Sequence, residues 1–176
     1  MNLFFRRLWV LLLASLSSKT APLDRPIALN YRVWFTDQDM FMHMTNSRYL
    51  SFSDLARLNL LIRTGILKKL RANRWRLEIC GQTRTITRML KAPQAFQMVC
   101  EIEGWSETHI AFNHAFKRRG NTHAVINTLM RVSDMDGNPV SPQSLMEAVR
   151  WTNASPALSE AFVGLANEID SAASSQ

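Results

Sequence analysis

Apolar side chains recur every three or four residues between positions 47 and 64, the spacing typical of one face of an α-helix. These side chains are Tyr49, Phe52, Leu55, Ala56, Leu60 and Leu61. Because Leu50, Leu58 and Ile62 widen the apolar stripe, we expect a helix that is buried on most of its sides. Gly65 is expected to end this helix, and Asn46 or Ser47 is expected to cap its start.

Elsewhere in the chain apolar and polar residues alternate, which indicates half-buried strands. The predicted strands cover residues 27–35, 79–90, 96–103, 110–116 and 124–132. Turns are expected at Ser106–Glu107 and Gly120–Asn121, so that the last four strands form an antiparallel meander wrapped around the helix. The alternation predicts that His114 is a core histidine, whereas His109 and His123, near the turns, are expected to be exposed.

The pattern divides the chain into three parts. Residues 1–21 form a predicted apolar and basic N-terminal helix, residues 22–140 the main domain, and residues 141–176 a helical C-terminal extension. In that extension the sequence predicts helices over 142–150 and 156–169, with Pro156 at the first position of the second.

The N-terminal segment carries Arg6 and Arg7 before an apolar stretch, Leu8 to Leu16. This stretch is far shorter than the roughly 20 residues that span a bilayer. The favoured interpretation of residues 1–20 is a helix on a membrane surface or against the domain itself. A signal peptide and a true membrane anchor are the alternatives. We therefore expect a cytoplasmic protein, with peripheral membrane contact as an open question.

Charge leaves three classes of partner to consider. The chain of 176 residues contains 21 Lys and Arg against 14 Asp and Glu, a net charge of +7. Such a charge suits nucleic acid, an anionic membrane or a phosphorylated small molecule. The basic residues are scattered and accompany no nucleic-acid-binding motif, so we expect no nucleic-acid partner. Cys80 and Cys100 fit neither a disulfide framework nor a zinc site, and no metal is expected.

The densest group of polar residues lies between the first strand and the long helix. Its members are Asp37, Asp39, His43, Thr45, Asn46 and Arg48. A helix N-terminus presents unpaired amides that favour an oxyanion, and a carboxylate beside it can act as a nucleophile or as a general base on water. The group therefore contains both components of an acyl-transfer site. The structural alternative is that the two aspartates only form turns and that Asn46 only caps the helix.

The run from Trp34 to Leu50, WFTDQDMFMHMTNSRYL, resembles the signature of hotdog-fold acyl-CoA thioesterases of the 4-hydroxybenzoyl-CoA thioesterase class. The resemblance continues into Asp54-Leu55-Ala56-Arg57 and covers roughly residues 27–135. It implies an α+β hotdog fold, in which an antiparallel sheet wraps a central helix. It also implies hydrolysis of a fatty or aromatic acyl thioester, carried by CoA or by an acyl carrier protein. No cofactor is implied, because water is the second substrate.

The resemblance also implies roles for individual residues. Asp39 would attack the thioester or activate water, and the backbone N–H groups of Thr45 and Asn46 would hold the oxyanion. His43 and Asn46 would orient the substrate or water, and Asp37 would be structural. The acyl group would contact Met40, Phe41, Met42 and Tyr49. The site would lie at a subunit interface in a homodimer or tetramer, with Arg84, Arg88, Lys117, Arg118 and Arg119 as candidates for the CoA phosphates.

The chain departs from the family pattern at three positions. One is Gln38, before the second aspartate of the run, where the family varies. Met42 replaces the glycine that often precedes the motif histidine, and Thr45 replaces the usual first asparagine. These departures favour one rival, a non-catalytic acyl-CoA or lipid-binding hotdog protein held at a membrane by residues 1–20. A second rival, a hotdog hydratase, would need an Asp and His motif that is not found.

Overall fold

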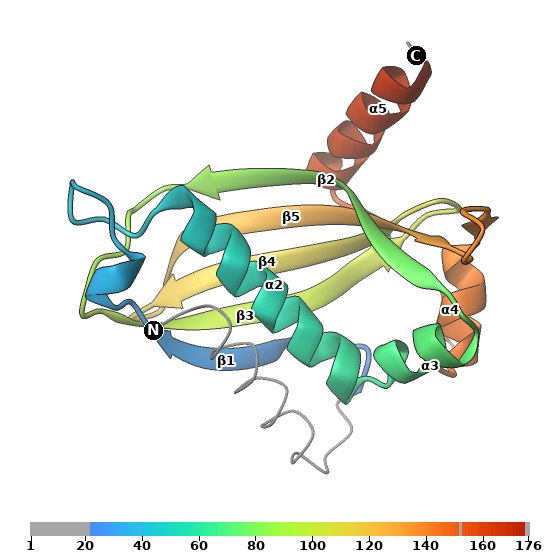
Figure 1. Ribbon diagram of the computed structural model, residues 1–176, viewed down its shortest axis with the longest axis horizontal. Coiled ribbons are helices and arrows are strands. Elements are labelled where there is room, and N and C mark those ends of the chain that lie inside the picture. Colours follow the sequence, from blue (N-terminus) through green and yellow to red (C-terminus); the bar gives the residue numbers. More distant parts are fainter. Residues whose placement is uncertain (1–21, 152, 175–176) are drawn as a thin grey trace.

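An antiparallel sheet with a long helix lying across one face forms the body of the protein (Figure 1). The computed structural model describes residues 22–151 and 153–174. The strands are β1 (Ile27–Arg32), β2 (Arg76–Ile86), β3 (Ala95–Trp105), β4 (Ile110–Arg118), β5 (Asn121–Ser133) and β6 (Pro139–Val140). The helices are η1 (Phe35–Asp37), α2 (Asn46–Arg63), α3 (Ile66–Ala72), α4 (Pro142–Ala148) and α5 (Glu160–Ser174).

The expectations for residues 1–20 lie outside the described residues. Of the helices that are described, none is both long and apolar enough to cross a membrane.

The strands are ordered β1-β3-β4-β5-β2, with β6 paired to β5. The predicted meander is correct for β3, β4 and β5. It is wrong for β2, which pairs with β5 at the end of the strand order and not with β3. Alternation specifies which face of a strand is buried, but it does not specify the strand's neighbour. Residues 87–94 connect the end of β2 to the start of β3. The N–H groups of Thr87 and Arg88 in this connection donate to the carbonyl of His123.

The central helix α2 packs against the sheet through the predicted apolar residues. Tyr49, Phe52, Leu55, Ala56 and Leu60 are almost fully buried. The Phe52 ring lies edge-on to Phe96 of β3, with ring centroids 5.2 Å apart. Gly65 ends this part of the chain with a φ of +79°, a left-handed conformation that glycine adopts without steric cost.

Helix α5 covers the opposite face of the sheet. Phe162 and Leu165 pack on Ala111 and Leu129, which alternate with sheet residues that face α2. The helix begins at Glu160 rather than at the predicted Pro156. The preceding residues are instead tied to the end of β3: the Ser155 hydroxyl accepts a hydrogen bond from the Trp105 N–H and donates one to the Trp105 carbonyl, both at 2.7 Å.

Three histidines are buried in the described structure. His114 was predicted in the core and is fully buried, with Nδ1 3.2 Å from the carbonyl oxygen of Ile126. The expectation of exposure for His109 and His123 was wrong: both side chains are buried, His123 at the point where the 87–94 connection forms hydrogen bonds with its backbone carbonyl. Burial, reinforced by the positive charge of Arg57, lowers the pKa of His114 to about 3.

We expect His114 to make the protein sensitive to mild acid. Between pH 6.5 and about 3 the unfolded chain binds a proton at His114 that the folded chain does not, so the free energy of unfolding falls as the pH falls. At roughly 1.4 kcal/mol per pH unit, wild type should lose about 2 kcal/mol more than His114→Gln between pH 7 and pH 5. Urea unfolding at both pH values measures the difference, with His43→Gln as the matched loss of one histidine. Parallel pH curves for wild type and His114→Gln would contradict the expectation.

Candidate active site

The polar group found in the sequence folds into a short hairpin loop between η1 and α2, at one end of the sheet (Figure 1). Gln38 and Met44 form an antiparallel bridge at its base. Above this bridge the Asp39 N–H donates to the His43 carbonyl at 2.9 Å, and the Met42 N–H donates to the Asp39 carbonyl at 3.1 Å. These bonds close the loop over five residues and bring Asp39 and His43 together.

The Asp39 carboxylate is exposed and held in place by the loop itself. Its Oδ1 accepts hydrogen bonds from the Phe41 N–H at 2.9 Å and from the His43 N–H at 3.2 Å. Within the described part of the chain, Oδ2 has no protein partner. One oxygen therefore fixes the orientation of the carboxylate, and the other is available to a substrate or water.

The backbone conformation at Met42 explains why the family often has glycine at this position. Its φ is +60°, in the left-handed region where a side chain costs about 1–2 kcal/mol and glycine costs little. The glycine that often stands here in the family therefore suits the backbone of this loop. In this chain the Gln38 side-chain amide donates to the Met42 carbonyl and supports the turn.

Asp37 lies beneath the loop and is fully buried. Its Oδ2 accepts the Trp34 N–H at 2.9 Å, and its Oδ1 lies 3.3 Å from Nε of Arg48. Its backbone carbonyl accepts the Thr45 N–H at 2.9 Å. Asp37 thus joins η1, the loop and the first turn of α2, in agreement with the structural role expected for it.

The N-terminus of α2 differs by one residue from the expected arrangement. Thr45 is the N-cap, and its N–H is already occupied by the Asp37 carbonyl. Among the described residues, the N–H groups of Asn46 and Ser47 have no acceptor, as is usual for the first turn of a helix. The free amides are therefore those of Asn46 and Ser47, one residue further along the chain than the pair, Thr45 and Asn46, that the resemblance implied.

A second connection fixes the loop from the sheet side. The Met44 N–H donates to the Leu90 carbonyl at 2.7 Å, and the Leu90 N–H donates to the Tyr49 hydroxyl at 2.9 Å. Tyr49 is fully buried, with its ring centroid 5.0 Å from that of Phe116, and burial raises the pKa of its phenol. Tyr49, predicted as a substrate contact, therefore lies behind the loop rather than on its surface.

Large apolar side chains cover the outside of the loop. Met40 is 86% exposed and Phe41 is 72% exposed, and Met42, Trp34 and Phe35 are each at least half exposed. An exposed apolar surface of this kind is typical of a site that contacts a ligand or another protein.

A basic groove lies at the same end of the sheet. Its volume is about 370 Å³, and its lining includes Asn30, Gln97, Lys117, Arg118 and Arg119. Lys117 pairs with Gln97 at the end of the sheet where β1 leads to η1 and the loop. In residues 22–151 and 153–174, no three His, Cys, Asp or Glu side chains gather as metal ligands.

Comparison with known proteins now places this arrangement in a family. Residues 33–162 match the family model described as the thioesterase-like superfamily. The chain belongs to this superfamily. A curated relative, protein THEM6 of zebrafish (Danio rerio), is 27% identical over 144 residues, which are 82% of this chain and 70% of the relative.

Solved structures of other proteins share the hotdog fold of this chain. The probable thioesterase YbaW from Escherichia coli has a TM-score of 0.66 and 14% identity, and the match covers 70% of this chain and 96% of YbaW. Protein SAV2348 from Staphylococcus aureus, solved in complex with CoA, has a TM-score of 0.62 and 15% identity, over 79% of this chain and 91% of SAV2348. These similarities confirm the predicted hotdog fold.

Proposed function

We propose that the protein hydrolyses an acyl-CoA thioester to a free acid and CoA, with Asp39 as the nucleophile or as the general base on water. The observation that carries this proposal is the Asp39 carboxylate, exposed and oriented by two amides of the loop that leads into the free amides of α2. Membership of the thioesterase-like superfamily supports it.

The proposed chemistry needs only groups that the loop and the first turn of α2 supply. As general base, the free Oδ2 of Asp39 takes a proton from water while the water oxygen bonds to the thioester carbonyl carbon. The carbonyl oxygen becomes an oxyanion, which the N–H groups of Asn46 and Ser47 stabilise. The C–S bond then breaks, the acid leaves, and the sulfur of CoA takes the proton.

Neighbouring residues are assigned supporting roles. His43 and the Asn46 side chain orient the water or the thioester, and Met40, Phe41 and Met42 contact a fatty or aromatic acyl group. Because these apolar side chains are so exposed in a single chain, we expect a second copy of the chain to cover them in a homodimer or tetramer. Buried Tyr49 is a positioning residue, because its hydroxyl holds the Leu90 backbone that in turn holds Met44.

We assign the basic groove to the phosphates of CoA. Reversing two charges there, in Lys117→Glu/Arg118→Glu, should raise KM for acyl-CoA about tenfold or more, with a much smaller change in kcat. The KM for an acyl-pantetheine substrate, which lacks the nucleotide phosphates, should change little. Steady-state kinetics at low salt tests this, with Lys68→Glu/Lys69→Glu on α3 as the matched control. Equal effects of the two double variants would show only a general loss of positive charge.

Thiol release from a panel of acyl-CoAs of increasing length tests the proposed activity. We expect release from at least one fatty or aromatic member, and the best substrate indicates the size of the acyl site. The rival function, a non-catalytic acyl-CoA or lipid-binding protein at a membrane, predicts binding to the same panel without thiol release. Binding without release would therefore overturn the proposal.

A further inference from the structure

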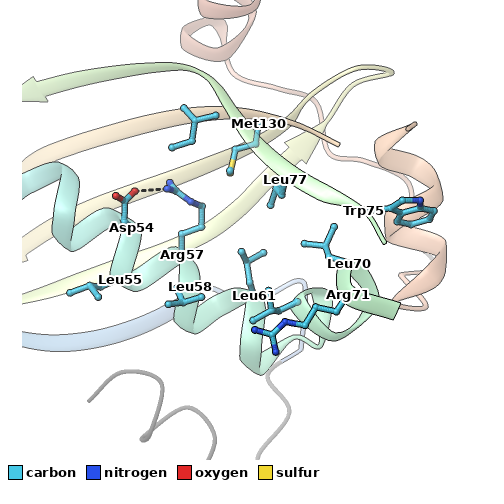
Figure 2. A pocket seen from close by; sticks show the side chains of 12 residues that line it. Asp54, Leu55, Arg57, Leu58, Leu61, Leu70, Arg71, Trp75, Leu77 and Met130 are labelled. Atoms are coloured by element: carbon cyan, nitrogen blue, oxygen red, sulfur yellow. Dashed lines mark hydrogen bonds and ion pairs between the residues drawn. The ribbon is translucent and has the colours of Figure 1, made fainter. Parts of the chain in front are cut away.

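A second cavity, of about 400 Å³, lies between α2, α3 and β2 (Figure 2). Its apolar lining includes Leu58, Leu61, Leu70, Trp75, Leu77 and Met130. None of its lining residues belongs to the hairpin loop or to the first turn of α2. At 1.5 Å per residue, the residues of α2 that line it, Asp54 to Leu61, lie about 12–22 Å along the helix from Asn46. Cavities that bind small molecules have volumes of roughly 300–1,000 Å³ and are mostly apolar with a few polar groups.

The polar group in this cavity is a buried guanidinium. Arg57 is only 5% exposed, and one of its terminal nitrogens, Nη2, forms an ion pair with Asp54 (Figure 2). The other terminal nitrogen, Nη1, is buried and has no acceptor among the described residues. Burying such a donor without a partner is unfavourable, and the penalty is larger for a charged group. Arg57 therefore lines an apolar cavity with an unsatisfied, positively charged donor buried in its wall.

The neighbouring charges indicate what kind of acceptor would fit. Three charged residues line the cavity, Asp54, Arg57 and Arg71, with one net positive charge. His114 and Cys100, two buried groups of the sheet whose pKa values the charge of Arg57 lowers, supply no negative charge, because burial keeps the imidazole and the thiol neutral. A ligand with a single negative charge would balance the site, and its remaining atoms would have to be apolar.

We propose that this cavity binds a medium-chain fatty acid, with its carboxylate accepting a hydrogen bond from Nη1 of Arg57. The alkyl chain lies among the leucines of α2 and α3 and against Trp75. At roughly 30 Å³ per non-hydrogen atom, the value for liquid water, the cavity holds about 13 such atoms. That is the size of a fatty acid of about ten carbons. The inference does not depend on thioester hydrolysis, since it concerns binding of a free acid at a different place on α2.

Isothermal titration calorimetry of the full chain with decanoate and with decanol tests the proposal. Wild type should bind decanoate at least tenfold more tightly than decanol, because only decanoate satisfies the charged donor. Arg57→Met should lose at least tenfold in decanoate affinity, and its decanol affinity should stay within about twofold. The variant is expected to fold, because the carboxylate that it leaves without a partner, that of Asp54, is 55% exposed and can be solvated by water.

Two further variants locate the ligand. Leu58→Trp keeps the guanidinium but fills the cavity, and it should abolish binding of both decanoate and decanol. Arg71→Met removes an exposed charge at the same cavity, and it should change decanoate affinity less than threefold. The proposal is overturned if wild type binds no decanoate, if decanol binds as tightly, or if folded Arg57→Met or Leu58→Trp binds decanoate like wild type.

Discussion

An Asp39→Asn variant should fold like wild type and hydrolyse its best acyl-CoA substrate at least about 100-fold more slowly. Positioned general acid–base groups contribute about 10²–10⁴-fold in rate, and an amide can neither remove a proton from water nor attack a thioester. The carbonyl oxygen of asparagine can still accept the N–H groups of Phe41 and His43 that hold the aspartate. The substitution therefore removes the base while preserving the hydrogen bonds of the loop.

Thermal unfolding and steady-state kinetics of the same preparations separate these two effects. The matched control is Asp136→Asn, which neutralises an exposed aspartate in the turn between β5 and β6 and should leave kcat and KM unchanged. Unchanged hydrolysis by Asp39→Asn would remove Asp39 from the mechanism while leaving the protein an enzyme. A loss of activity accompanied by a clear fall in Tm would instead indicate that the aspartate supports the loop.

The sequence predicted the elements of the fold better than their arrangement. The spacing of Tyr49, Phe52, Leu55 and Leu60 defined α2, because a helix that faces a sheet must bury a continuous stripe. The alternation of Phe96 and its neighbours likewise identified the inner face of β3. Both patterns arise from local geometry, so they are visible in a single sequence.

Contacts between distant parts of the chain were not visible. The position of β2 beside β5 depends on the 87–94 connection, whose Leu90 forms hydrogen bonds with Met44 and Tyr49. No repeating pattern in the sequence indicates either contact, since each joins groups more than 40 residues apart. The error at His109 and His123 has the same origin: a residue near a turn is exposed only if no other segment of the chain covers it.

The motif predicts where the candidate site lies in the chain but gives limited information on its geometry. The hairpin loop contains Asp39 and His43, as the resemblance implied, and the structure adds the two amides that fix the carboxylate. The sequence could not show that the Thr45 N–H is occupied by Asp37, which moves the free amides to Asn46 and Ser47.

Asp37→Ala should lower the free energy of unfolding by about 3–5 kcal/mol, the usual cost of breaking a buried ion pair by removing one partner. The substitution leaves the Trp34 N–H without its acceptor and the Arg48 guanidinium without its carboxylate. Arg48 is only partly accessible to water, so solvent compensates incompletely. Urea unfolding at pH 7 measures the change.

Glu78→Ala is the matched control, because Glu78 and Arg131 also form an ion pair with an N···O distance of 3.3 Å. Both side chains of that pair are well exposed, and exposed pairs contribute about 0–1 kcal/mol. A similar small loss in both variants would mean that Asp37 does not hold the loop through its buried charge. A large loss only in Asp37→Ala would show that the same ion-pair distance stabilises the fold strongly when the carboxylate is buried. It would also identify Asp37 as the group that anchors the loop carrying Asp39 to the first turn of α2.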